Sequence, residues 1–181
     1  MLEINARLPV KNLPIRRVLP KLFQSYVYKQ LPEKEHRGYQ HPSGKPFKSM
    51  NFMIAYRDYD LVIKYVALNK EHEKRIAQAV LLDGLKLGEI HIAGTELSLR
   101  NRHTKVSEKI SAKGYVAAAI KDGKSNKKIY LEPRTHKFQE IIRNHTLQKY
   151  EALFGKSYTG VLEIKLLHQA KRARRFFYNK G

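Results

Sequence analysis

Cysteine and tryptophan are both absent from this chain of 181 residues, and no long stretch of it is apolar. The absence of cysteine excludes disulfide frameworks and thiolate metal sites, and is typical of the reducing cytosol. No run approaches the roughly 18 apolar residues of a membrane span, and the first residues lack the basic and apolar regions of a signal peptide. We therefore expect a cytoplasmic protein with no membrane partner.

Acidic residues are also few: 16 Asp and Glu stand against 36 Lys and Arg, which gives a formal net charge of +20. The spacings D-x-x-E and H-E-x-x-H are absent, so a two-metal nuclease is not expected. The glycine-rich nucleotide-binding spacings G-x-x-x-x-G-K-[ST] and G-x-G-x-x-G are absent too. Because such a surplus of positive charge repels itself in a compact protein, we expect a polyanionic partner, RNA above all.

The first half of the chain alternates between strand and helix periodicities. The last of its strands changes phase at Ala93 and Gly94, which we interpret as a bulge or a bend. Together the segments follow the order β-α-β-β-α-β of a ferredoxin-like domain over residues 1–104. The expected elements are a strand at 2–8, a helix ending at Leu31, strands at 47–56 and 61–67, a helix from Asn69 to Gly84, and a strand at 90–99.

The second half begins in a similar way. We expect a hairpin from strands at 115–120 and 128–131, a helix at 134–154 that ends at Gly155, and a strand at 161–167. The chain stops before the remaining strands and the second helix of such a unit could follow. The predicted fold class is therefore α+β, with tandem ferredoxin-like (RRM-like) domains of which the second, residues 105–181, is incomplete.

The two predicted helices of the first half each have one apolar face. In the second helix, Ile76, Val80 and Leu81 are expected to face inward. In the first helix, Tyr28 lies roughly 150° from the middle of the apolar stripe, whereas Tyr26 belongs to it. Tyr26 is thus predicted to be a core residue and Tyr28 an accessible one. The stripe consists of Leu19, Leu22, Phe23, Tyr26, Val27 and Leu31.

The polar segment that follows Tyr28 combines histidines and lysines. RNA can be cut without a metal if its own 2′-hydroxyl attacks the adjacent phosphate, which needs a base, an acid and a cation. Histidine can serve as acid or base near neutral pH, and lysine supplies positive charge. The alternative interpretation is a polar loop of solvated side chains. The candidates are His36, His41, Lys45 and Lys48, whereas His72, His91, His136 and His145 are expected to be structural or solvated.

Two clusters of basic residues are candidates for RNA binding. The first lies in the link between the two halves, and its alternative is an ordinary charged linker. The second precedes Phe176, Phe177 and Tyr178, so it combines phosphate binding with stacking surfaces, and its alternative is a solvated strand end. The clusters comprise Arg100, Arg102, Lys105, Lys171, Arg172, Arg174 and Arg175.

Several of these segments, in this order, resemble the CRISPR repeat-RNA endoribonucleases, the "Cas six" family. The resemblance runs along essentially the whole chain. It ends before the family's glycine-rich C-terminal segment, so the chain is C-terminally incomplete by comparison. The segments are Tyr-Val-Tyr-Lys-Gln-Leu at 26–31, His-Arg-Gly-Tyr at 36–39, Lys-Pro-Phe-Lys-Ser-Met-Asn-Phe at 45–52, Lys-Tyr-Glu-Ala-Leu-Phe-Gly at 149–155 and Ala-Lys-Arg-Ala-Arg at 170–174.

The resemblance implies two tandem ferredoxin-like folds and a Tyr-His-Lys cleavage site that needs neither metal nor cofactor. The tyrosine of that site corresponds to Tyr28. Its histidine corresponds to His36, with His41 as the alternative, and its lysine to Lys48, with Lys45 as the alternative. The implied activity is cleavage of precursor CRISPR RNA within the repeat, which leaves a 5′-hydroxyl and a cyclic or 2′,3′-type phosphate end.

The expected partner is CRISPR repeat RNA. An RNA-guided effector complex or a second copy of the chain in a homodimer are further expected partners. The alternative function is that of a non-catalytic, basic RNA-binding protein, either ribosomal or a subunit of an RNA-guided complex. The net charge and the order of the elements would be equally suited to it.

Overall fold

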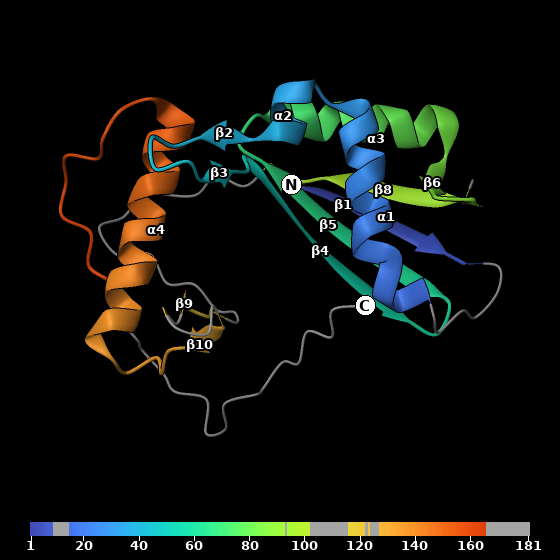
Figure 1. Ribbon diagram of the computed structural model, residues 1–181. Helices are drawn as coiled ribbons and strands as arrows, with labels where there is room; N and C mark the ends of the chain where they lie inside the picture. The colour runs from blue at the N-terminus through green and yellow to red at the C-terminus, as the bar shows by residue number, and fades with distance from the viewer. Residues whose placement is uncertain (9–14, 93, 102–115, 122, 124–126, 166–181) are drawn as a thin grey trace. The chain divides into compact units, whose positions relative to one another are not determined.

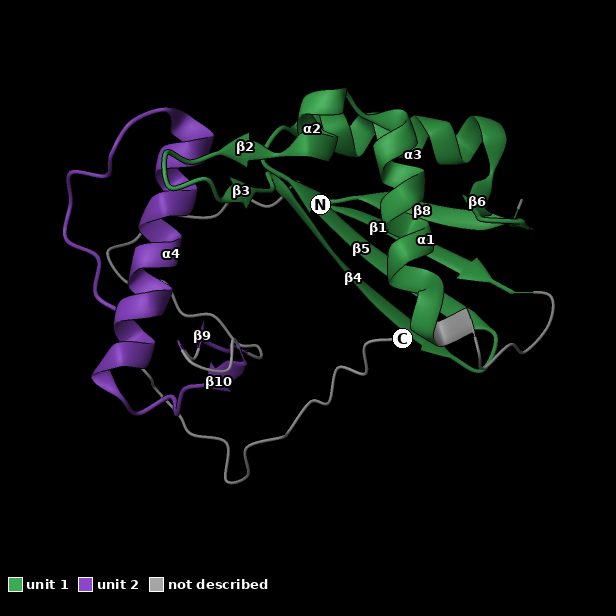
Figure 2. Cartoon of the chain, in the orientation of Figure 1, with its two compact units in different colours: residues 1–109 green, residues 110–181 purple. Residues whose placement is uncertain are grey.

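The computed structural model describes residues 1–8, 15–92, 94–101, 116–121, 123 and 127–165. The chain divides into two compact units, Met1–Lys109 and Ile110–Gly181 (Figure 2). The domain boundary predicted between residues 104 and 105 lies outside the described residues. None of the helices in the described part of the chain combines the length and the apolar content that a membrane span requires.

Unit 1 is built on a four-stranded antiparallel sheet with the strand order β4-β5-β1-β8 (Figure 1). Its main elements follow the predicted order β-α-β-β-α-β, which is the ferredoxin-like arrangement. They are β1 (Leu2–Arg7), α1 (Ile15–Gln30), β4 (Met50–Arg57), β5 (Asp60–Ala67), α3 (Lys70–Asp83) and β8 (Thr95–Leu99).

One face of this sheet forms the core together with α1 and α3. In the register, Ile4 of β1 lies between Ile63 of β5 and Leu97 of β8, so alternate residues point to the same side. Ile4 and Ile63 are fully buried. On α1 the predicted apolar stripe is confirmed, since Leu19, Phe23, Tyr26, Val27 and Leu31 are all buried.

The prediction for α3 is correct except at one position. Ile76 and Val80 are buried as expected, but Leu81 is 69% exposed and Ala77 takes the inner position instead. At about 100° per residue, Leu81 lies roughly 90° from the middle of the buried face, which is too far to reach the sheet. Asn69 caps the helix by accepting a hydrogen bond from the Glu71 amide, and Gly84 ends it, both as predicted.

The opposite face of the sheet mixes polar and charged side chains with exposed apolar ones such as Met53 and Val66. The register places Asn5 between Val62 and Glu96, and Glu3 beside Lys64, whose ammonium lies 3.4 Å from the Glu3 carboxylate. No position that the register assigns to this face is aromatic, because the aromatic residues of β4 and β5 alternate onto the core face. This sheet therefore lacks the stacking side chains with which an RRM sheet binds RNA bases.

Between α1 and β4 the chain forms a small substructure where a loop was predicted. It consists of a short helix, α2 (Glu33–Arg37), and a two-stranded hairpin, β2 (Tyr39–Gln40) and β3 (Pro46–Phe47). Composition alone did not indicate these elements because each is only one turn or two residues long.

The single strand predicted at 90–99 is wrong. Residues 90–92 form β7 (Ile90–Ile92), which pairs with β6 (Leu85–Leu87), an element that the sequence did not indicate. Residues 95–99 form β8, which pairs with β1. The described segments on either side of the change of phase therefore belong to two different sheets.

The described part of unit 2 contains a hairpin and one long helix. The strands β9 (Ala119–Lys121) and β10 (Lys128–Tyr130) pair antiparallel, which confirms the predicted hairpin with shorter strands. The helix α4 (His136–Phe154) is capped by Thr135 and ends at Gly155 in the left-handed conformation, as predicted to within two residues. Of the strand predicted at 161–167, the described residues 161–165 are not in a strand.

Candidate functional site

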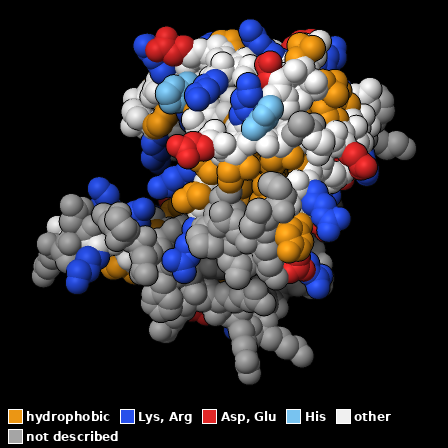
Figure 3. Space-filling view, turned by 90° about the vertical axis from the view of Figure 1, so that its right-hand side faces the viewer, with side chains coloured by type: hydrophobic (Ala, Val, Ile, Leu, Met, Phe, Trp, Pro, Cys, Tyr) orange, Lys and Arg blue, Asp and Glu red, His pale blue; other side chains and the backbone are white. Residues whose placement is uncertain are grey.

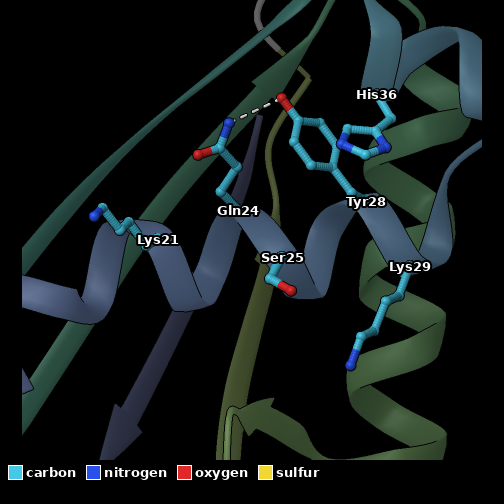
Figure 4. Close-up of a pocket in the computed structure, with 6 residues that line it drawn as sticks. All are labelled: Lys21, Gln24, Ser25, Tyr28, Lys29 and His36. Atoms are coloured by element: carbon cyan, nitrogen blue, oxygen red, sulfur yellow. Dashed lines mark hydrogen bonds between the residues drawn. The ribbon is translucent and has the colours of Figure 1, made fainter.

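Tyr28, His36 and Lys48, the three predicted site residues, lie together in unit 1. The rings of Tyr28 and His36 are in contact, with centroids 4.6 Å apart and planes inclined by 34° (Figure 4). The Lys48 ammonium lies 5.1 Å from the centroid of the Tyr28 ring. The structure thus brings the imidazole of His36 on α2 and the ammonium group of Lys48, between β3 and β4, close to the phenol ring of Tyr28 on α1.

The meeting of Tyr28 and His36 follows from the short connection between α1 and α2. Only Leu31 and Pro32 separate the two helices, and the Leu31 side chain is buried in the core. Pro32 cannot continue α1, and its fixed φ suits the start of a new helix. The chain therefore changes direction at once, and the first turn of α2 carries His36 back to the Tyr28 ring.

Lys48 is brought to the same place by the β2–β3 hairpin. Tyr39 pairs with Phe47, so residue 38 and Lys48 follow next in the register. Gly38 has φ = 86°, and a Cβ atom there would lie 2.8 Å from the Phe47 carbonyl oxygen. Only glycine permits this close approach of the end of α2 to the strand that leads to Lys48.

The ammonium group of Lys48 is held by the end of α2. It donates hydrogen bonds to the backbone oxygen of Glu35, at 3.3 Å, and to that of His36. Carbonyl groups in the last turn of a helix have no partner within the helix, and lysine side chains commonly satisfy them. Lys48 therefore fastens its own segment to the turn that carries His36.

A buried carboxylate lies beneath this turn. Glu35, only 4% exposed, accepts hydrogen bonds from the Tyr39 hydroxyl, at 2.7 Å, and from the Ser49 hydroxyl. The hydrogen bond to Glu35 raises the pKa of the Tyr39 phenol above its ordinary value. His72 of α3 lies 4.0 Å from the same carboxylate, which agrees with the structural role expected for this histidine.

Glu35 links the residues on both sides of the site. It neighbours His36 in sequence, and its partner Ser49 neighbours Lys48. Sequence reasoning missed this role because a glutamate in the first turn of a helix is usually solvent-exposed and explained by the helix dipole.

Tyr28 has a second neighbour on its own helix. Gln24 donates a hydrogen bond of 2.9 Å from its side-chain amide to the Tyr28 hydroxyl oxygen. Because this oxygen accepts from Gln24, the phenolic proton remains available for another acceptor. The spacing of four residues on the outer face of a helix is the sequence signal that could have identified this pair.

Gln24, Tyr28 and His36 border a shallow hollow of about 470 Å³. No acidic side chain lines it, so its electrostatic character suits an anionic ligand. The lining residues are Lys21, Gln24, Ser25, Tyr28, Lys29 and His36 (Figure 4).

The two alternative residues lie at the other end of the hairpin. His41 begins the turn between β2 and β3, where its backbone amide donates to the Lys45 carbonyl oxygen at 3.0 Å. The His41 ring packs edge-on against Phe47, and its Nδ1 lies 2.8 Å from the Ser43 hydroxyl. The histidine in ring contact with Tyr28 is His36.

Of the predicted RNA-binding residues, the structure describes Arg100. It follows β8 directly, and its backbone exchanges hydrogen bonds with Met1 at 3.0 Å in both directions, while the side chain is exposed. The other six lie outside the described residues. They are Arg102, Lys105, Lys171, Arg172, Arg174 and Arg175.

The sequence contains one D-x-D pair, Asp58 and Asp60. It lies where β4 turns into β5, and Asp58 adopts a positive φ of 56° there. Aspartate tolerates this conformation better than most residues, which explains its place in the turn. Within the described residues no three His, Cys, Asp or Glu side chains gather as a metal-binding group would.

Comparison with known proteins identifies relatives only among solved structures. No family model matches the sequence, and no curated protein does. A CRISPR associated protein Cas6 aligns with a TM-score of 0.51 and 17% identity over 87% of this chain and 72% of the other. An RAMP protein binding different RNA substrates aligns with a TM-score of 0.39 and 14% identity over 87% and 73%.

An identity of 17%, as in the Cas6 alignment, gives information about the fold alone. The TM-score of 0.39 of the RAMP alignment is too low to establish a shared fold. The Cas6 alignment extends over most of both chains, and at the level of the fold it confirms the family resemblance found in the sequence. The chain shares the fold of a CRISPR-associated Cas6 protein.

Proposed function

We propose that this chain is an endoribonuclease that cuts precursor CRISPR RNA within the repeat and needs no metal ion. The observation that carries the proposal is the contact of Tyr28 with His36, which both line a hollow without acidic side chains, and the position of the Lys48 ammonium beside the Tyr28 ring. The shared fold with a CRISPR-associated Cas6 protein supports the same substrate class.

In the proposed reaction the 2′-hydroxyl of one nucleotide loses its proton and attacks the adjacent phosphorus. The bond to the 5′-oxygen of the next nucleotide breaks, and that oxygen gains a proton. The products are a 2′,3′-cyclic phosphate and a 5′-hydroxyl. His36 exchanges a proton with a reacting oxygen, which imidazole can do near neutral pH.

The other two residues act on the phosphate. The Tyr28 hydroxyl, whose oxygen accepts from Gln24, directs its own proton toward a phosphate oxygen. The Lys48 ammonium stabilises the negative charge that develops on the phosphoryl group during attack. No step in this scheme requires a cofactor.

The remaining expectations belong to the same proposal. Residues 105–181 would form part of a second ferredoxin-like domain. Arg100, Arg102, Lys105 and the basic residues 171–175 would bind RNA phosphates, and each phosphate neutralised on a single strand should contribute about 0.7 to the slope of log affinity against log salt. An effector complex or a homodimer would be the wider assembly.

The decisive experiment is single-turnover cleavage of a repeat RNA in EDTA. His36→Ala should lose roughly 10²–10⁴-fold in rate, the usual contribution of a general acid or base, with RNA affinity almost unchanged. Lys48→Ala should be slowed by a comparable factor through lost charge stabilisation. His41→Ala and Lys45→Ala are the matched controls and should cleave at nearly the full rate.

The substrate provides a second control. A 2′-deoxy sugar on the nucleotide 5′ of the cut removes the nucleophile and should abolish cleavage. If His36→Ala cleaved at full rate while His41→Ala did not, the role would belong to His41. Full rates in both variants would refute the mechanism, and binding of repeat RNA by the unmodified chain without cleavage would establish the non-catalytic alternative.

A further inference from the structure

Three polar residues follow one another along the outer face of α1. Lys21, Ser25 and Lys29 are spaced four residues apart, so they lie on successive turns of the same side of the helix. At 1.5 Å per residue the row extends for roughly 12 Å along the axis. Figure 4 shows Ser25 between the two lysines, and all three border the hollow that also contains Tyr28 and His36.

The two lysines have no acidic partner within the described part of the chain. The sequence from residue 15 to residue 30 contains no Asp or Glu at all. Two exposed lysines on other helices are paired at short spacing: Lys74 lies 2.7 Å from Glu71 on α3, and Lys137 lies 3.1 Å from Glu140 on α4. The lysines of the row on α1 differ from these two because their own helix offers no acidic side chain.

The charge of the protein surface is not uniform. On the face that Figure 3 presents, acidic side chains lie among the Lys and Arg side chains. In a chain of net charge +20, unpaired lysines that line a hollow repel one another and the other positive charges of the protein. A bound anion reduces this electrostatic repulsion. The hydroxyl of Ser25 adds a neutral donor between the two charges.

We propose that Lys21, Ser25 and Lys29 form a track for the backbone of single-stranded RNA, next to the Tyr28–His36 contact. Lysine and serine are common phosphate ligands, and a row of roughly 12 Å is longer than a single phosphate group. The rings at one end of the row offer a stacking surface for an unpaired base. The track rests on the proposed function, since it holds the strand whose neighbouring phosphate is cut.

The track should bind without regard to sequence, because its contacts are to phosphates. Its residues are also different in sequence from those of the basic clusters at 100–105 and 171–175. Its removal should therefore weaken binding of every single-stranded RNA to a similar degree, and should lower affinity more than it lowers the cleavage rate of bound RNA.

The test compares two double variants of the full chain. Lys21→Gln with Lys29→Gln removes the track lysines, and Lys70→Gln with Lys74→Gln removes two exposed lysines from α3. Both lower the net charge by two and keep side chains of similar size at exposed positions. Equal melting temperatures in the two variants would establish that any difference in binding does not come from unfolding.

We measure affinity for a single-stranded repeat RNA over a series of salt concentrations. The track variant should bind about tenfold more weakly at low salt, as expected for loss of hydrogen bonds from charged donors. Its salt slope should fall by up to about 1.4, two phosphates at 0.7 each. The control variant should remain within about twofold of the unmodified chain.

Cleavage by the same variants separates this inference from the proposed function. The half-saturating RNA concentration for cleavage should rise about tenfold in the track variant and should stay within about twofold in the control variant. Equal losses in the two double variants, or an unchanged slope in the track variant, would overturn the track. If the affinities change as expected but the unmodified chain does not cleave RNA, the proposed track is upheld and the proposed nuclease activity is overturned.

Discussion

The helices α1 and α3 cover the same face of one sheet, yet their outer faces are unlike. On α3 the exposed side chains include the ion pair of Glu71 with Lys74, the capping Asn69 and, near its end, Leu81 and Leu82. The outer face of α1 has no acidic residue and carries Tyr28, with its hydroxyl bonded to Gln24. Of the two helices, α1 is therefore the one that carries residues of the candidate site.

The same contrast appears between the two buried carboxylates. Glu73 of α3 accepts from the Met1 ammonium at 2.6 Å and from the Ala67 amide at 3.1 Å, so it ties the ends of two core strands to the helix. Glu35 of α2 binds two hydroxyl groups from the segments beside His36 and Lys48. One buried acid supports the core, and the other supports the candidate site.

The largest expected effect distinguishes the two faces of α1. Tyr26→Ala removes a buried aromatic ring and should cost about 3 kcal/mol of unfolding free energy, similar to Ile76→Ala on α3. Tyr28→Ala should cost much less, because its side chain is only partly buried. Urea unfolding of the three variants measures this, and a cost for Tyr28→Ala as large as that for Tyr26→Ala would invalidate the distinction between the faces.

A smaller effect should separate the buried carboxylates. Glu35→Ala leaves the Tyr39 and Ser49 hydroxyls without their acceptor and should cost about 1–3 kcal/mol. It should also slow cleavage by folded protein, since the turn that carries His36 is no longer held. Glu73→Gln should lower stability but leave the cleavage rate of folded protein unchanged. If both variants cleaved at full rate, Glu35 would have only a structural role.

The N-cap of α3 should contribute stability alone. Asn69→Ala removes the hydrogen bond accepted from the Glu71 amide and should cost about 1 kcal/mol. Asn69→Asp, which keeps an acceptor, should restore most of the loss. Thermal unfolding measures both variants, and the cleavage rate of Asn69→Ala should equal that of the unmodified chain. A slowed rate would show that α3 takes part in the site.

The smallest effect concerns the Tyr26 hydroxyl, which is buried and has no hydrogen-bond partner within the described residues. Tyr26→Phe should therefore leave stability at neutral pH unchanged or slightly higher. Burial, and to a lesser extent the charge of Asp83, raises the pKa of Tyr26 to about 12. The folded state therefore keeps a proton that the unfolded state loses near pH 10, and stability should fall as the pH rises from about 10 to about 12.

Unfolding free energies measured across this alkaline range test the assignment. The fall should be less steep in Tyr26→Phe. It should not vanish, because burial also raises the pKa of Tyr65. An identical pH profile in the variant and the unmodified chain would show that Tyr26 does not titrate in this way. Tyr28→Phe serves as the matched control, with unchanged stability and slower cleavage.

Much of unit 1 could be predicted from local patterns. The alternation in residues 2–8 and 61–67 identified two central strands, and the helical period separated Tyr26 from Tyr28 before any contact was known. Elements of one turn or less, such as α2 and the β2–β3 hairpin, were missed because they are too short to show a period. The division of residues 90–99 into β7 and β8 was also missed. β7 pairs with β6 and β8 pairs with β1, and neither segment alone encodes its partner strand.

The sequence by itself determined the chemical groups and the helix face on which Tyr28 lies, because helical geometry relates neighbouring residues directly. It left His36 and His41, and likewise Lys48 and Lys45, undecided from the residues alone. Only the tertiary structure brought Tyr28, His36 and Lys48 into contact. That contact depends on the pairing of Tyr39 with Phe47 and on the close approach at Gly38, interactions between residues whose distance in space cannot be read from their separation in the chain.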